Sequence, residues 1–312
     1  MTGYLIRRLL WLAPVLFFAA LVTFLLMHLV PGGPWDTNDR PLSPELEERL
    51  ENKYGLNEPI WQQFLTFSWN AVQGDLGVSF QYQDRPVTSI IREGVEVSAV
   101  LGLMALTFAL VVGVTLGVVA AVRQNSVIDY VSVFLATAAA STPSFVLGIL
   151  LIVVFAVQLG WLPVFGWEKT WWLLPNWKQA ILPTITLGAL PAAYIARITR
   201  AAVLEVLEQD YVRTARAKGL QERLVLGRHV LKNAMIPVLT VSGPIAASLV
   251  TGSFIVETVF AIPGLGKQFV ASVFQRDYGM IMGITIFYAW VIAMANLLVD
   301  VMYVGVNPRI RY

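Results

Sequence analysis

The chain has 312 residues, of which 57% are hydrophobic and only 13% are charged. This composition is too apolar for an ordinary soluble domain and indicates an integral membrane protein. The net charge of +2 is small, and the charges are segregated along the chain without interleaved aromatics, which argues against a nucleic-acid-binding surface. Because the sequence has no cysteine, disulfides, thiol catalysis and thiolate metal sites are excluded.

Six charge-poor segments are long enough to cross a membrane. The first, residues 9–30, has no formal charge and would extend about 33 Å as a helix, enough for a hydrocarbon core of roughly 30 Å. Its apolar run is longer than that of a signal peptide and no A-x-A cleavage site follows, so we interpret it as a retained helix. The other segments are residues 97–122, 130 to about 159, 179–196, 233–256 and 278–299. We therefore predict an all-α membrane protein with six transmembrane helices.

The distribution of cations predicts the orientation of these helices. If both termini lie in the cytoplasm, the short cytoplasmic segments carry 13 of the 22 Lys and Arg residues, eight of them between Arg197 and Lys232. The long outer segment 31–98 carries five cations and eleven acids, so it is net negative and suits the opposite side. We expect two regions: 1–98, with the first helix and this outer segment, and a core of 99–312.

The outer segment is the one candidate for structure away from the bilayer. Ser43-Pro44-Glu45 resembles a helix start, with an N-cap followed by proline, and predicts a short charged helix to about Lys53. A dense group of apolar side chains follows, and it would aggregate if left in water. We expect these residues to pack on the membrane surface or on the outer helix ends: Trp61, Phe64, Leu65, Phe67 and Trp69.

Small residues and helix breakers recur in the spans. Gly113 and Gly117 form a G-x-x-x-G pattern, which favours close helix packing over a binding role. Pro183 and Pro191 are expected to interrupt the fourth span, and Gly243-Pro244 the fifth.

The cationic stretch 200–233 lies between two spans and is too charged to cross the membrane. Good helix formers occupy 201–217, Lys218 adds a cation at the helix end, and Gly219 is the residue type that closes a helix in a left-handed turn. After it, Leu220, Leu224 and Leu231 share one helical face. A helix, a tight turn and a second helix with a face for a partner are predicted.

This stretch resembles a known loop. The run Asp210-Tyr-Val-Arg-Thr-Ala-Arg-Ala-Lys-Gly-Leu220, followed by Arg228-His-Val-Leu-Lys-Asn-Ala234, is similar to the cytoplasmic coupling loop of permease subunits of ATP-binding-cassette (ABC) importers of the dipeptide/oligopeptide type. Further stretches resemble the same family in the same order, namely Glu257-Thr-Val-Phe-Ala-Ile-Pro-Gly-Leu-Gly-Lys267, Arg276-Asp277-Tyr278, Asn296-Leu-Leu-Val-Asp300 and Pro308-Arg-Ile-Arg-Tyr312.

The resemblance implies the type I importer permease fold, alternating access and a location in the bacterial or archaeal cell membrane. It implies a second permease subunit, usually a paralogue rather than a second copy, two cytoplasmic ATPase subunits and an extracytoplasmic solute-binding protein. The substrate would be a dipeptide, an oligopeptide or a related solute. The residues that it assigns to ATPase coupling are Arg213, Ala215, Arg216, Ala217, Lys218, Gly219, Leu220 and Glu222.

Polar side chains in the fifth span are candidates for the lining of the pathway: Thr240, Ser242, Ser248, Thr251 and Ser253. Hydrogen bonds between packed helices would explain them equally well.

The sequence lacks the residues that ATP binding and metal binding require. No P-loop exists, because Gly264-Leu-Gly-Lys267 is followed by Gln268 and lacks the first glycine, so we expect ATP to be hydrolysed by another subunit. Neither His28 nor His229 has a neighbour at metal-ligand spacing, and no cofactor or metal is expected. The main alternative is an ion-gradient-driven carrier or channel without an ATPase, which predicts an ionisable residue in the membrane and an inverted repeat. An intramembrane enzyme and a structural anchor are weaker alternatives.

Overall fold

The computed structural model describes residues 2–35, 43–82, 85–171 and 174–306, and within them the chain is almost entirely helical. The long helices are α1 (Thr2–Leu29), α4 (Val87–Val122), α7 (Trp177–Leu207), α10 (Leu231–Val250) and α13 (Tyr278–Val306). The shorter helices are α2 (Pro44–Tyr54), α3 (Ile60–Val72), α5 (Val127–Ser141), α6 (Ser144–Leu151), α8 (Asp210–Ala217), α9 (Glu222–Leu224), α11 (Phe254–Val259) and α12 (Leu265–Phe274). Two π-helical segments, η1 (Ile152–Gln158) and η2 (Val225–Val230), and a short antiparallel strand pair, β1 (Lys169–Trp171) and β2 (Leu174–Pro175), complete the described elements.

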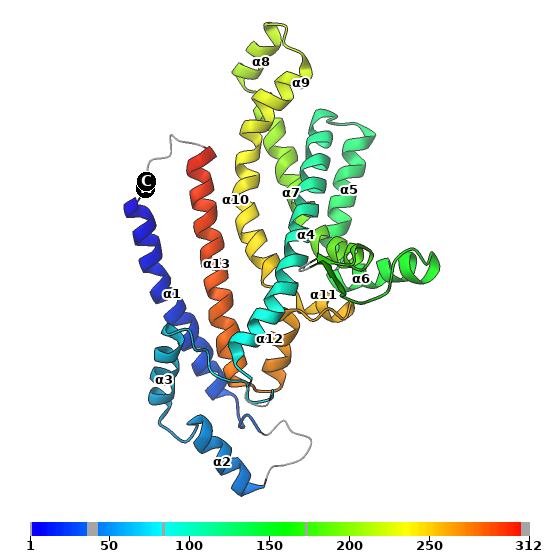
Figure 1. Cartoon of the computed structure of the whole chain (residues 1–312). Helices are drawn as coiled ribbons and strands as arrows, with labels where there is room; N and C mark the ends of the chain where they lie inside the picture. Colours follow the sequence, from blue (N-terminus) through cyan, green and yellow to red (C-terminus); the bar gives the residue numbers. More distant parts are fainter. Residues whose placement is uncertain (1, 36–42, 83–84, 172–173, 307–312) are drawn as a thin grey trace.

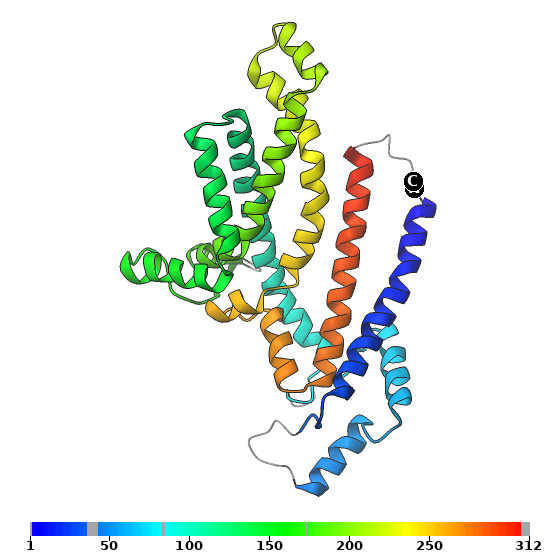
Figure 2. The same ribbon diagram turned by 180° about the vertical axis from the view of Figure 1, so that it is seen from behind.

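The long helices stand side by side in a bundle (Figure 1). The first residues of α1, the last residues of α13 and the α8–α9 hairpin lie at one end, as the predicted orientation with both termini in the cytoplasm requires. At the other end, α2 and α3 lie beyond and beside the outer end of α1. Seen from behind, α1 and α13 form a pair beside the group of α4, α5, α7 and α10 (Figure 2).

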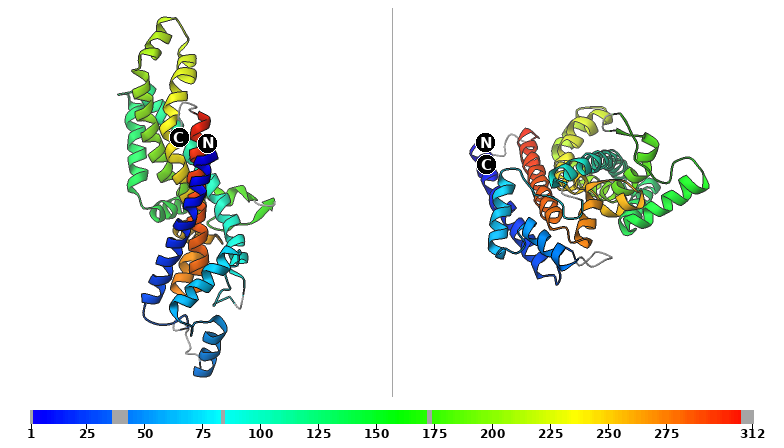
Figure 3. Two further views of the ribbon diagram at one scale, coloured as in Figure 1. Left: turned by 90° about the vertical axis from the view of Figure 1, so that its left-hand side faces the viewer. Right: turned by 60° about the horizontal axis from the view of Figure 1, so that its bottom comes forward.

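Five helices are long and apolar enough to span a membrane, and a sixth candidate span is broken. The segment predicted as one helix over 130 to about 159 forms α5 and then α6 with η1, which turn away from each other by 109°. The break falls at Thr142 and Pro143, because proline lacks the N–H that a continuing helix needs and forces Thr142 into an extended conformation (φ −92°, ψ 122°). As a result α6 runs across the bundle rather than along it (Figure 3).

Two further predictions about the spans are wrong, one about where the fifth span ends and one about its prolines and those of the fourth span. The fifth span was expected to continue to residue 256, but α10 ends at Val250 and Gly252 follows with a left-handed φ of +91°. The prolines do not interrupt their helices either: α7 contains Pro183 and Pro191, and α10 contains Pro244. Packing against neighbouring helices keeps these segments helical in spite of the lost hydrogen bonds.

The most extensive helix pair in the bundle is α4 with α7, and the G-x-x-x-G pattern explains its closeness. A Cβ atom built on Gly113 would lie 2.7 Å from the carbonyl oxygen of Ala192, and one on Gly117 would lie 2.6 Å from that of Ala196. Because any larger residue would push the backbones apart, the packing role predicted for these glycines is confirmed. This tight pair is the rigid support from which the cytoplasmic hairpin projects.

Candidate coupling site and pathway

The coupling region is a helical hairpin at the cytoplasmic end of the bundle (Figure 1). The single helix expected over 201–217 is two helices, because α7 ends at Leu207 and Gln209 adopts an extended conformation (φ −70°, ψ 144°) before α8 begins. After α8 the chain turns at Gly219 and returns through α9, η2 and α10 as one continuous helical rod. The predicted helix–turn–helix is therefore present, with an additional bend at its base.

Gly219 closes α8 as the sequence predicts. Its φ is +76°, in the left-handed region, and its N–H donates to the carbonyl of Arg216 (2.9 Å). The next N–H, of Leu220, donates to the carbonyl of Ala215 (3.4 Å). These two bonds form a Schellman motif, in which glycine is favoured because it has no Cβ to clash in a left-handed conformation.

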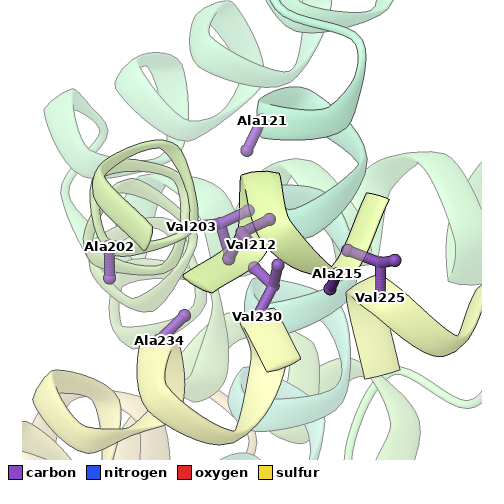
Figure 4. Packing of buried hydrophobic residues seen from close by; sticks show 8 residues of the cluster. All are labelled: Ala121, Ala202, Val203, Val212, Ala215, Val225, Val230 and Ala234. Carbon is purple, nitrogen blue, oxygen red and sulfur yellow. The ribbon is translucent and has the colours of Figure 1, made fainter. Parts of the chain in front are cut away.

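A small apolar core holds the hairpin on the bundle (Figure 4). Val212 and Ala215 from α8 meet Val225 and Val230 from η2, together with Val203 of α7, and all five are buried. Ala215 is only 5% exposed, so among the residues assigned to coupling it packs inside the hairpin rather than on its surface.

The other residues assigned to coupling are exposed: Arg213, Arg216, Ala217, Lys218, Gly219, Leu220 and Glu222. Leu224 is also exposed, although Leu231, which was expected to share its face, packs against the core. Across the turn, Arg216 donates through Nη2 to Glu222 Oε1 (2.7 Å) and through Nε to Oε2 (3.2 Å). Hydrogen bonding to this carboxylate raises the pKa of Arg216, and the two opposite charges pair beside the exposed leucines of the hairpin tip.

Two polar contacts brace the hairpin from below, and sequence reasoning missed both. Asn233 Nδ2 donates to the hydroxyl of Tyr211 (2.8 Å), which joins α10 to the start of α8. Asp129, near the start of α5, receives two 2.7 Å hydrogen bonds from the guanidinium of Arg200 in α7. The run Ser126-Val-Ile-Asp129 has the spacing of a helix N-cap motif, but that local signal does not identify an arginine 71 positions away.

Three of the five pathway candidates share one face of α10 and of its C-terminal cap residue, Thr251. Thr240, Ser248 and Thr251 follow each other at near-helical spacing, and Thr240 and Ser248 are exposed. Ser242 lies on a different face, and Ser253 lies beyond α10, where its Oγ accepts from the N–H of Val256 and caps α11. The hydroxyls of Thr240, Ser242, Ser248 and Thr251 each donate to a carbonyl three or four residues earlier in the chain. The bonds donated by Ser242, Ser248 and Thr251 stay within one helical segment, whereas the alternative explanation needs bonds between two helices.

At the outer end, a buried carboxylate joins three elements. The side chain of Glu257 in α11 is fully buried and accepts a hydrogen bond from the hydroxyl of Ser98 in α4 (2.7 Å) and from the N–H of Lys267 in α12 (2.7 Å). Ser98 in turn accepts from the N–H of Leu265 (2.8 Å). Burial raises the pKa of Glu257, and these hydrogen bonds oppose that effect. We call Glu257, Ser98 and the start of α12 the outer clamp.

A second buried carboxylate lies nearby. Asp277 precedes α13 and accepts from the hydroxyl of Ser79 and from the N–H groups of Phe80 and Met280 (both 3.2 Å). It thereby caps α13 and fixes the loop that leads into α4. The sequence motifs contain Glu257 and Asp277, but nothing in them indicates the serines that pair with these acids.

The bundle and the hairpin define a class of membrane transport component. Among solved structures, the chain resembles the inward-facing MetNI methionine ABC transporter (TM-score 0.57, 18% identity, 70% of this chain and 97% of that chain). It also resembles an amino acid ABC transporter crystallised with histidines (TM-score 0.51, 21% identity, 69% and 94%). The fold is that of a type I ABC importer permease.

Sequence comparisons define the family more closely. Residues 113–312 match the family described as binding-protein-dependent transport system inner membrane component, and the chain belongs to this family. Over 100% of both chains it is 39% identical to the oligopeptide transport system permease protein OppB of Haemophilus influenzae and 42% identical to the glutathione transport system permease protein GsiC of Escherichia coli O6:H1. It is 39% identical to the dipeptide transport system permease protein DppB of Bacillus subtilis, over 100% of this chain and 98% of that protein. The chain is therefore a multi-pass inner-membrane permease of a binding-protein-dependent ABC importer.

Proposed function

We propose that this permease imports peptides by alternating access, driven by separate ATPase subunits that bind its α8–α9 hairpin. The observation that carries the proposal is the hairpin itself, a helical lever with a glycine-closed tip that projects beyond the spanning helices and exposes Leu220 and Leu224 beside cations (Figure 1). Exposed leucines on a cytoplasmic tip are costly in water and are stabilised when a partner covers them.

The packing of the hairpin can transmit motion from its tip to the bundle. Its core joins α8 to α7, η2 and α4, so a displacement of the tip is carried directly to the helices that form the bundle. We propose that closure of two ATPase subunits moves the hairpins of two permeases and switches the pathway between inward-open and outward-open states. The second permease would be a paralogue, and this chain itself would perform no covalent chemistry.

The proposed pathway follows the exposed face of α10. Ser248 and Thr251 satisfy their hydroxyl donors within their own helical segment and keep acceptor lone pairs for water or for a peptide backbone. A row of weak, sequence-independent contacts suits a substrate class that varies in its side chains. The identities near 40% to permeases named for oligopeptides, dipeptides and glutathione support peptides as that class.

The absence of cysteine in the chain makes a direct test of the hairpin possible. Leu224→Cys, in the assembled transporter and treated with a short bifunctional thiol-to-amine cross-linker, should form an adduct with an ATPase subunit. Val127→Cys, exposed and apolar at the start of α5, is the control and should form much less. Peptide uptake into vesicles by the Leu224→Cys transporter without such an adduct would show that the hairpin is not the ATPase contact.

A further inference from the structure

The helix α3 has three different faces: one packs against α1, a second faces a cavity, and a third is exposed. Phe64 is buried against α1, with its ring 5.6 Å from that of Phe17 and 5.3 Å from that of Phe24. Gln63, Thr66 and Asn70 face a cavity of about 460 Å³ between α3 and the outer ends of α1 and α13. In addition, Gln63 Nε2 donates to the carbonyls of Leu56 and Glu58 and so fixes the start of the helix.

The third face is an apolar stripe without a partner among the described residues. It consists of Trp61, Leu65, Trp69 and Val72, which recur at spacings of four, four and three and are between 57% and 83% exposed. No residue of α3 is charged, whereas the preceding helix α2 carries six charged residues in eleven positions. The contrast shows that α2 is suited to water and α3 is not.

The depth of α3 follows from its contacts with two spanning helices. Phe17 lies twelve residues before the end of α1, or about 18 Å along the helix, which is more than half of a hydrocarbon core of roughly 30 Å. Leu76, just after α3, lies beside Gly283 of α13, where an added Cβ would come within 3.4 Å of it. Gly283 is five residues inside the outer end of α13, or about 8 Å along the helix. Thus α3 lies beside the outer halves of α1 and α13 rather than beyond them.

We propose that α3 is embedded in the outer leaflet of the bilayer, with the Trp61–Val72 stripe in contact with lipid acyl chains. At the same depth α1 also exposes Phe18, Val22 and Leu25, so α3 extends a lipid-facing surface that the spanning helices already present.

Embedding of α3 in the lipid gives the outer segment a physical role. A helix held by lipid on one face and by Phe64 on another keeps the polar cavity at the membrane boundary, between α3 and the bundle. It also anchors α2, which is joined to α3 by only a short turn, close to the outer mouth of the bundle.

Two adjacent positions test which face meets lipid. Trp69 lies on the stripe and Asn70 faces the cavity, so single cysteines at these positions share one depth and differ in the face they occupy. Each variant, Trp69→Cys and Asn70→Cys, is labelled with bimane in the assembled transporter. The transporter is then reconstituted in vesicles of phosphatidylcholine and phosphatidylglycerol with and without doxyl-labelled acyl chains.

The label at Trp69→Cys should lose most of its fluorescence to doxyl lipid and little to aqueous iodide, whereas the label at Asn70→Cys should be quenched less by the lipid. Glu48→Cys, exposed on α2, should respond to iodide alone. Strong iodide quenching at Trp69→Cys would place the stripe in water and overturn the proposal. Protection of Trp69→Cys from both quenchers, or a spectral shift when the solute-binding protein is added, would assign the stripe to a protein partner and overturn it equally.

Discussion

The two ends of this permease are held together in opposite ways. At the cytoplasmic tip, Arg216 and Glu222 are six positions apart and both are exposed, and the Schellman motif at Gly219 is equally local. At the outer end, Glu257 reaches Ser98 over 159 positions and Asp277 reaches Ser79 over 198, and these side chains are buried.

This difference determines which end can bind a partner and which end moves as a single body. Local, exposed contacts give the hairpin a fixed shape and leave its surface free for a partner. Buried carboxylates that join distant segments make the outer end a single body, because separating those segments would leave polar groups without hydrogen bonds in a water-poor environment. We therefore expect substitutions in the outer clamp to reduce stability, and substitutions in the hairpin to reduce transport while the fold persists.

The largest effect on stability is expected for Glu257→Ala. The substitution removes the acceptor for the buried Ser98 hydroxyl and for the partly buried Lys267 N–H, and leaving both donors unpaired costs about 3 kcal/mol. Thermal unfolding of the detergent-solubilised transporter, followed by size-exclusion chromatography, should show a clearly lowered midpoint.

Glu257→Gln is the matched control for this effect. It retains one oxygen that can accept from Ser98 and a similar volume, so it should lose less stability than Glu257→Ala. An unchanged midpoint for Glu257→Ala would mean that the clamp does not hold α4, α11 and α12 together.

The sequence predicts the hairpin well and the outer clamp poorly, and the physical reason is the range of the interactions. A glycine after a helix with a cation at its end specifies its own turn, so Gly219 could be assigned without any structure. The partner of Glu257 depends on how α4 packs against α12, which no local pattern contains. The 109° change of direction at Thr142 and Pro143 could not be predicted, because apolar composition satisfies a membrane equally well along the bundle or across it.

The second largest effect is expected for Gly219→Val, and it should appear in transport. A left-handed residue with a Cβ costs about 1–2 kcal/mol, and a β-branched residue costs more. No atom lies within 4 Å of the added Cβ, so the chain should still insert and fold while the tip loses its shape. Peptide uptake and co-purification of the ATPase should both fall severely.

Gly227→Val is the control for added bulk in the same loop. Gly227 also has no atom within 4 Å of a built Cβ, but it lies in η2 without a left-handed φ. Uptake should therefore persist in Gly227→Val. Equal losses in the two variants would show that bulk at the partner surface, rather than the conformation of the turn, is what matters.

A smaller effect is expected for Asp129→Asn at the base of the hairpin. The substitution keeps an oxygen for the N–H of Asn125 but loses the charge and one of the two acceptors that pair with Arg200, at a cost of about 2 kcal/mol. The unfolding midpoint should fall by less than in Glu257→Ala. A loss of ATPase-dependent uptake at full stability would instead make this pair part of the moving lever.

The smallest effect is expected for Arg216→Ala, because the Arg216–Glu222 pair is about half exposed on both sides. Exposed pairs contribute about 0.2–1 kcal/mol and are screened by salt, so the hairpin should survive on its apolar core and its glycine turn. A double-mutant cycle with Glu222→Ala, measured on thermal unfolding at low and high salt, isolates the coupling between the two side chains. The coupling should be small at low salt and nearly absent at high salt. A larger coupling that resists salt would mean that the tip depends on this ion pair as the outer end depends on Glu257, and the contrast between the two ends would not hold.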